Sequence, residues 1–168
     1  MPTLKNAPDS LLALACDLIA YEPSSGVMTW RANRYRVVAG QLAGSAHPRG
    51  YLTITLAQKR ILAHRLAWAL HHGTWPERQV DHVNGDRTDN RIANLRLATA
   101  SQNACNSGAR RTNKTGLKGV TRAGNRWRAT IMIAGKQHNL GRFDSPEAAH
   151  EAYAAGAARL HGVFARAA

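Results

Sequence analysis

The sequence predicts an α+β protein built from two small modules. Apolar residues recur at helical spacing in some segments and alternate with polar residues in others, and Gly-rich turns separate them. We expect a first module over residues 1–106, in which a helix and hairpins precede a strand–loop–strand–helix unit at 79–106. A polar linker is expected over 107–115. Residues 116–168 predict a three-stranded antiparallel sheet packed on one helix.

The N-terminal part of the first module predicts a helix followed by short strands. Leucines recur at helical spacing within residues 9–21, and residues 23–26 have the composition of a turn. A strand is expected over 26–30. The alternating run at 50–56 and the short return at 60–62 predict a hairpin.

The middle of the chain predicts a buried helix and then a more polar unit. Residues 63–72 carry an apolar stripe and are followed by glycine, which often ends a helix in the left-handed conformation. Strands are expected at 80–83 and 94–99, joined by a loop rich in turn residues. Thr99 and Gln102 have the spacing of a capping box, which predicts a helix directly after the second strand.

The second module predicts three strands and a helix. Strands are expected over 118–122 and 126–134, and a third strand ends at Phe143. Ser145 and Pro146 are typical of the N-cap and first position of a helix. The apolar side of that helix is expected to be formed by Ala149, Ala152, Tyr153 and Leu160.

Charge is the first guide to a partner. The chain has 23 Lys and Arg against 10 Asp and Glu, a formal net charge of +13, and no acidic residue lies between Asn90 and Phe143. Such a field attracts polyanions and favours a nucleic acid as partner, with a solvated basic surface as the alternative. No stretch is apolar enough to cross a membrane. The isolated Cys16 and Cys105 are typical of a reducing compartment, so we expect a cytoplasmic protein.

The densest chemistry lies around Asp81 and His82. Hydrolysis of a phosphodiester needs a base that deprotonates water and a cation that neutralises charge at the phosphate. Neutral His82 suits the base, while the oxygens of Asp81 and Asn103 suit one Mg²⁺ or Mn²⁺ ion, not a structural zinc. Neighbours on a strand point to opposite faces, so Asp81 and His82 need a twisted strand to serve one phosphate. A structural Asp81–His82 ion pair is the alternative.

Residues 64–106 resemble the HNH family of phage and bacterial homing endonucleases, and the run VDHVNGDRTDNRIANLRLATASQN is close to the family pattern throughout. The likeness extends back through residues 26–30 and the hairpin that begins at Gly50. It implies a ββα-metal finger around a single divalent ion, with a short and strongly twisted first strand.

The resemblance also implies a role for each matching residue. His82 corresponds to the general base and Asp81 to the metal-binding acid before it. Asn94 corresponds to the middle residue of the catalytic signature, which braces the loop by hydrogen bonds to the backbone. Asn103 corresponds to a second metal ligand, a position where many relatives carry His.

Three polar residues near this signature have open roles. Asp86 and Asp89 are expected to form the loop through Asx turns, although Asp86 could approach the metal. His64 could equally pack in the protein or contact a phosphate.

Residues 112–162 resemble the AP2 DNA-binding domain, through the run RWRATI, the LGRF segment and an alanine-rich helix. The resemblance implies that a basic sheet face enters the major groove of duplex DNA, while Trp127 packs in the core. The side chains expected at the DNA are Arg122, Arg126, Arg128, Thr130, Lys136 and Arg142. Plant AP2 factors carry a Trp in the first turn that this chain lacks, so their sequence preference is not transferred.

These features together predict a divalent-metal-dependent endonuclease that acts on double-stranded DNA, in the bacterial host cytoplasm if a phage encodes it. They leave the oligomeric state open, with a monomer favoured. One alternative is a DNA-binding regulator that uses the finger only as a scaffold. Another is an RNA-binding accessory protein, which would not need the B-form groove.

Overall fold

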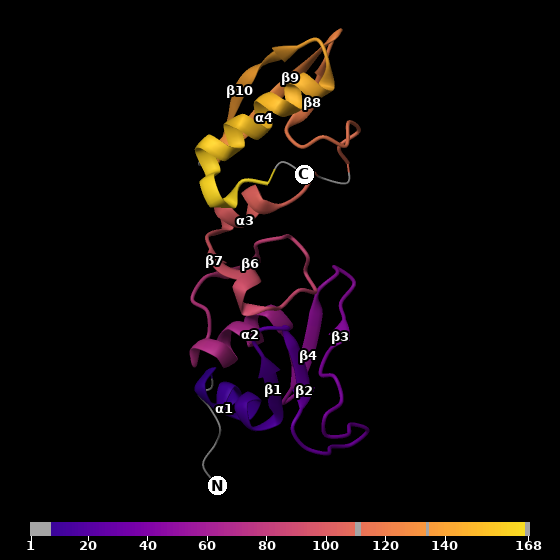
Figure 1. Ribbon diagram of the computed structural model, residues 1–168, viewed down its shortest axis with the longest axis vertical. Coiled ribbons are helices and arrows are strands. Elements are labelled where there is room, and N and C mark those ends of the chain that lie inside the picture. Colours follow the sequence, from indigo (N-terminus) through magenta and orange to yellow (C-terminus); the bar gives the residue numbers. More distant parts are fainter. Residues whose placement is uncertain (1–7, 110–111, 134, 167–168) are drawn as a thin grey trace. The chain divides into compact units, whose positions relative to one another are not determined.

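A computed structural model describes residues 8–109, 112–133 and 135–166 (Figure 1). The chain divides into two compact units, Met1–Leu97 and Ala98–Ala168, and each is considered by itself. The boundary after Leu97 lies before the helix that the sequence predicts at the end of the first module. That helix therefore belongs to the second unit.

The first unit opens with helix α1 (Pro8–Leu18), which passes directly into strand β1 (Ile19–Glu22). β1 pairs antiparallel with β2 (Val27–Trp30) across the predicted turn, and Ile19 lies opposite Trp30. The helix is thus shorter than the sequence predicts. The apolar stripe continues into Ile19, but this β-branched residue is buried as the first member of the hairpin, and tertiary pairing overrides the helical pattern.

A three-stranded sheet follows, in the order β3-β4-β5. Strands β4 (Leu52–Leu56) and β5 (Lys59–Leu62) form the predicted hairpin, and both residues of its turn, Ala57 and Gln58, have positive φ. The edge strand β3 (Ser45–Ala46) was not predicted, because two residues are too few to show an alternating pattern.

Helix α2 (Ala63–His72) has the predicted bounds. Gly73 ends it in the left-handed conformation, with φ 73°, and donates its N–H to the Ala69 carbonyl.

Two short strands, β6 (Gln79–His82) and β7 (Leu95–Ala98), then form a sheet of their own. We call them the finger strands, and residues 83–94 between them the finger loop. The loop ends in a 3-10 turn at Ile92–Asn94. Their order before the next helix, strand–loop–strand–helix, is that of a ββα-metal fold.

One hydrophobic core holds the first unit together, and it includes both finger strands. Its buried members are Ala15, Ile19, Met28, Ile54, Leu56, Leu66, Ala67, Val80 and Leu95. Val80 comes from β6 and Leu95 from β7. The strands that carry the candidate site are therefore positioned by the same core as the N-terminal elements.

The second unit begins with helix α3 (Ala100–Asn106). The predicted capping box is present: the Thr99 side chain accepts from the Gln102 N–H, and the Gln102 side chain accepts from the Thr99 N–H. Asn103 lies within this helix.

The second unit contains a three-stranded antiparallel sheet in the order β10-β9-β8. Its strands are β8 (Val120–Ala123), β9 (Arg126–Ile133) and β10 (Lys136–Phe143). The expected extension of the second strand to Ala134 lies outside the described residues.

Helix α4 (Pro146–His161) covers one face of this sheet (Figure 1). Ser145 caps it by accepting from the Ala148 N–H, as predicted. The buried contacts between α4 and the sheet are made by Val120, Ala129, Ile131, Ala149, Tyr153 and Ala157. The prediction was wrong for Leu160, which is exposed near the end of α4.

Candidate active site

The finger loop is built by hydrogen bonds from its own Asn and Asp side chains. Asp86 accepts from the N–H and the hydroxyl of Thr88, and Asn84 accepts from the N–H of Asp86. Asp89 accepts from the N–H of Arg91 and also forms an ion pair with its guanidinium at 2.6 Å. The Asx turns predicted at Asp86 and Asp89 are confirmed.

Asn94 ties the two ends of the finger loop together. Its amide oxygen accepts from the Asn84 N–H at 3.0 Å, and its amide nitrogen donates to the Asp89 carbonyl at 2.8 Å. Its own carbonyl accepts from the Val83 N–H. This buried side chain therefore fixes the loop by bonds to the backbone at its start and at its middle.

His82 is the last residue of β6 and is 4% exposed. Its Nε2 lies 3.3 Å from the amide oxygen of Asn90, another buried residue of the finger loop. Burial lowers the pKa of His82 below its ordinary value, against the opposing effect of the bond to Asn90. The imidazole is therefore neutral at neutral pH, the state that a general base requires.

Two aromatic rings from outside the finger pack around His82. The His64 ring lies edge-on to it, with centroids 4.9 Å apart, and Tyr51 lies 6.1 Å away. The guanidinium of Arg87 in the finger loop lies over the Tyr51 ring and donates to the Arg49 carbonyl. The N-terminal elements therefore form part of the surroundings of His82.

The open question about His64 is answered by its burial. The side chain is 5% exposed, and burial, with the nearby His82 and Arg65 acting in the same direction, lowers its pKa to about 3. A ring that stays neutral at neutral pH offers no charge to a phosphate. His64 is therefore a packing residue beside His82.

The low pKa of His64 predicts a loss of stability in acid. Between about pH 6.5 and about pH 3 the unfolded chain binds a proton at His64 and the folded chain does not, so lowering the pH favours unfolding. His64→Phe keeps an aromatic ring but cannot bind the proton. Its melting temperature should therefore fall less than that of the wild type between about pH 7 and pH 5, as followed by circular dichroism. Equal falls would contradict the low pKa.

Asp81 is paired with Arg96 across the finger strands. The carboxylate is buried, and its Oδ2 accepts from Nε of Arg96 at 2.9 Å and lies 2.8 Å from Nη2. The sequence did not predict this ion pair, because nothing in the spacing of residues 81 and 96 indicates that their side chains meet. The guanidinium compensates the buried negative charge.

The side chains proposed as metal ligands can be compared with the ligand atoms that different metal ions take. Among the described residues, no group of three or more His, Cys, Asp and Glu side chains is placed to hold a metal ion. The carboxylate oxygens of Asp81 are ligands of the kind that Mg²⁺ and Mn²⁺ take, together with several waters. Asn103 lies in α3 of the second unit and is described with that unit.

The open face of the second sheet carries some of the predicted DNA-binding side chains. Along β9, Trp127, Ala129 and Ile131 face α4, so the alternate residues Arg126, Arg128 and Thr130 point away from the helix. Directly opposite residues of an antiparallel pair share a face, which places Arg142 with its partner Arg128. We call Arg126, Arg128, Thr130 and Arg142 the open sheet face.

The prediction that Arg122 lies on this face was wrong. Arg122 pairs with Trp127, a residue of the helix-facing side, and its guanidinium lies over the Trp127 ring. Lys136 likewise lies opposite Ile133, which packs with the core. The strand registers of β8 with β9 and of β9 with β10 decide which face of the sheet each of these residues occupies. The sequence alone does not show those registers.

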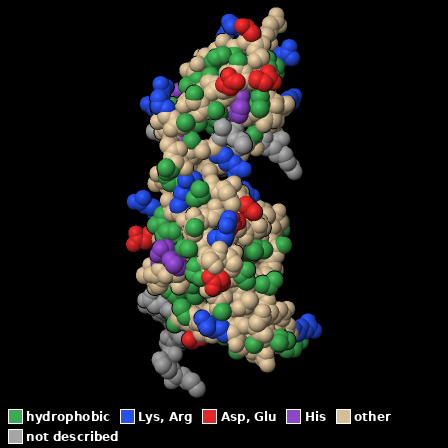
Figure 2. Space-filling view, viewed as in Figure 1, with side chains coloured by type: hydrophobic (Ala, Val, Ile, Leu, Met, Phe, Trp, Pro, Cys, Tyr) green, Lys and Arg blue, Asp and Glu red, His purple; other side chains and the backbone are tan. Residues whose placement is uncertain are grey.

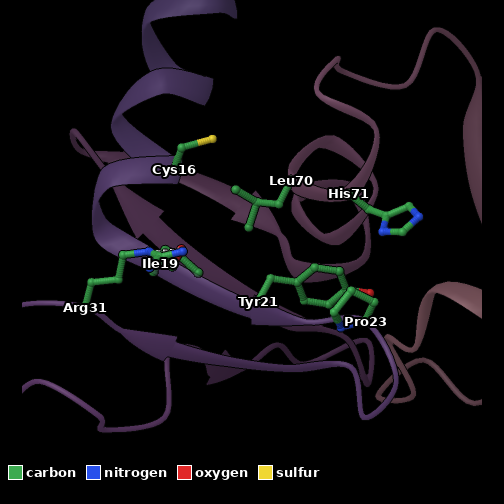
Figure 3. Close-up of a pocket in the computed structure, with 7 residues that line it drawn as sticks. All are labelled: Cys16, Ile19, Tyr21, Pro23, Arg31, Leu70 and His71. Carbon is green, nitrogen blue, oxygen red and sulfur yellow. Dashed lines mark hydrogen bonds between the residues drawn. The ribbon is translucent and has the colours of Figure 1, made fainter.

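A surface pocket of about 210 Å³ lies elsewhere in the first unit, among α1, β1 and α2 (Figure 3). It is lined by Cys16, Ile19, Tyr21, Pro23, Arg31, Leu70 and His71. None of the predicted site residues lines it. Its Tyr21 nevertheless reaches the finger loop, because the hydroxyl donates to the Asn90 carbonyl at 2.8 Å.

Lys and Arg side chains are spread over the visible face of both units (Figure 2). No helix of the described residues is long and apolar enough to cross a membrane.

Comparison with known proteins identifies the family of this chain. The pattern of the HNH endonuclease family matches residues 62–105, which include the finger strands and most of α3. Protein 3.8 of Escherichia phage T7 is 35% identical over 106 residues, 61% of this chain and 87% of the phage protein. An uncharacterized HNH endonuclease of Acanthamoeba polyphaga mimivirus is 33% identical over 86 residues, 51% of this chain but only 44% of the viral protein. No solved structure matches the chain significantly. The chain belongs to the HNH endonuclease family and is a nuclease.

Proposed function

We propose that the protein is a divalent-metal-dependent endonuclease, of the homing-endonuclease type, that hydrolyses phosphodiester bonds in double-stranded DNA. The observation that supports this most directly is the buried, neutral His82 directly after the carboxylate of Asp81. The loop that follows this strand is braced by the Asn94 side chain. The phage relative supports a bacterial host cytoplasm as its setting. The oligomeric state stays open, with a monomer favoured.

In the proposed reaction His82 takes a proton from the attacking water. Asp81 and Asn103 would hold one Mg²⁺ or Mn²⁺ ion, which supplies charge neutralisation at the phosphate and the leaving oxygen. Arg96 keeps the Asp81 carboxylate in place by its ion pair. Asn94 keeps the finger loop in register with β6, so that the base does not move relative to the carboxylate. We expect products with 5′-phosphate and 3′-hydroxyl ends.

The second unit would locate the substrate, as an AP2-like DNA-binding module. Its open sheet face presents three arginines to the outside, and Arg126 is held by an exposed ion pair with Asp144, which a phosphate could replace. Within the described residues, Nε of Arg128 is buried and lacks a hydrogen-bond partner. A buried guanidinium nitrogen of this kind favours an anion as its partner.

The register of the sheet predicts which arginines matter for DNA binding. Arg142→Ala on the open sheet face should weaken binding and reduce the slope of log K against log salt by about 0.9 for each phosphate that the variant no longer binds. Arg122→Ala on the helix side is the matched control and should leave the slope unchanged. Fluorescence anisotropy of a labelled duplex over a range of salt concentrations measures both. Equal effects of the two changes would contradict the proposed orientation.

The proposed function is tested with metal-stripped protein and supercoiled plasmid. We expect nicked or linear products only after Mg²⁺ or Mn²⁺ is added, and none in the presence of a chelator. Binding without metal-dependent cleavage of plasmid, host or phage DNA would instead indicate a regulator that uses the finger as a scaffold. Preferential binding of structured RNA in competition would indicate an RNA-binding protein.

A further inference from the structure

We infer that Asn90 is a positioning residue for the base: its amide oxygen accepts the Nε2–H of His82 and so leaves the lone pair on Nδ1. The inference rests on the proposed function, because it assigns Nδ1 as the atom that takes the proton from water. Neither the family pattern nor the spacing of the motif assigns this role to Asn90.

The orientation of the Asn90 amide is set by a second hydrogen bond. Its nitrogen donates to the Thr88 carbonyl at 3.1 Å, and the side chain is buried, with the residue 2% exposed. The oxygen is therefore the atom that faces His82, at 3.3 Å from Nε2. A carbonyl oxygen cannot donate, so Nε2 must carry the proton of the neutral ring. This selects one of the two tautomers.

The backbone of Asn90 is held by the N-terminal hairpin, which comprises β1, β2 and the turn between them. Tyr21 donates its hydroxyl to the Asn90 carbonyl at 2.8 Å, and the Pro23 carbonyl accepts from the Ile92 N–H at 3.1 Å. At Gly26 the two backbones lie so close that a Cβ atom would be 2.6 Å from the carbonyl carbon of Asn90. Figure 3 shows Tyr21 beside Pro23 at the base of this turn.

Through these contacts the N-terminal hairpin holds Asn90 in place, and Asn90 in turn orients His82, the proposed base. A neutral imidazole in water exchanges between two tautomers, and a ring in the wrong tautomer cannot take a proton at the required nitrogen. Loss of the partner that fixes the tautomer of a metal-ligating histidine commonly costs about 10- to 100-fold in activity, and we expect a loss of at least this order for a histidine that acts as base. An effect of this size on kcat is expected for Asn90, without a matching effect on KM.

The test compares Asn90→Ala, Asn90→Asp and Thr53→Ala in the full-length protein. Asn90→Ala removes the acceptor and Asn90→Asp retains one. Thr53→Ala is the control, because it removes another buried polar group of the first unit, whose hydroxyl donates to the Ser45 carbonyl. Each variant is measured for thermal unfolding, for kcat and KM on a plasmid substrate, and by ¹⁵N NMR of the imidazoles, with the His82 signal assigned from His82→Ala.

In the wild type we expect the His82 proton on Nε2. Asn90→Ala should give a mixture of tautomers and a kcat lowered about 10- to 100-fold with KM nearly unchanged, while Asn90→Asp should keep the Nε2 proton and recover most of the rate. Thr53→Ala should change neither the tautomer nor kcat. A wild-type tautomer and rate in Asn90→Ala would overturn the inference. The inference would also be overturned if kcat fell in proportion to the melting temperature and Asn90→Asp did not restore it. The NMR result needs no DNA cleavage, so a wild type that does not cut DNA would refute the proposed function separately.

Discussion

Replacing His82 with alanine is expected to lower the rate of DNA cleavage by roughly 100- to 10,000-fold, the usual range for removal of a general base, and to leave DNA affinity close to that of the wild type. The imidazole is buried and neutral, which is the state that a general base requires. DNA affinity should persist because it depends on the basic surfaces of both units. Single-turnover cleavage and anisotropy, measured on the same duplex, separate the two effects.

The matched control for this prediction is His72→Ala. His72 lies in the last turn of α2 and is exposed, so its loss should alter neither cleavage nor binding. Circular dichroism of His82→Ala would show whether the fold survives the cavity. A folded His82→Ala protein that cuts DNA as fast as the wild type would exclude His82 as the base.

Gly26→Ala is expected to destabilise the first unit by about 2–5 kcal/mol, the sum of an overpacking cost and a left-handed backbone cost. Gly26 has φ 75°, and a Cβ atom there would lie 2.5 Å from the backbone nitrogen of Arg91. Backbone atoms cannot turn aside as a flexible side chain can, so the N-terminal hairpin must move away from the finger loop. Chemical denaturation followed by tryptophan fluorescence measures the loss.

Gly40→Ala separates the two costs. Gly40 also has positive φ, 83°, but a Cβ atom there would meet nothing within 4 Å. It should therefore lose only about 1–2 kcal/mol, the backbone cost alone. Equal losses for Gly26→Ala and Gly40→Ala would show that the close approach to the finger loop does not contribute.

Local signals in the sequence were sufficient for much of the fold. Helix α2, the β4–β5 hairpin and the capping box of α3 lie where they were predicted, because each is specified by residues close together in the chain. The face of β9 that packs on α4 was also predicted, since strict alternation survives in an eight-residue strand. The candidate residues Asp81, His82 and Asn94 came from the motif.

The features that could not be predicted depend on pairing between distant segments. The end of α1 is set by a hairpin partner, and the position of Arg122 by a register across a turn. The contacts of His82 with Asn90 and of Asp81 with Arg96 join residues whose spacing carries no signal. A single sequence shows which side chains can do the chemistry, but packing decides which of them support the others.

The most direct test of the account is a double-mutant cycle on Asp81 and His82. We propose that both side chains serve one phosphate. When residues act as a unit, removing both lowers the rate little more than removing one. Single-turnover rates on one duplex, with Mg²⁺ or Mn²⁺ present, would be compared for Asp81→Asn, His82→Ala and the double variant. We expect the double variant to cleave within about threefold of the rate of the slower single variant. Losses that multiply would contradict it, because they would show that Asp81 and His82 act independently.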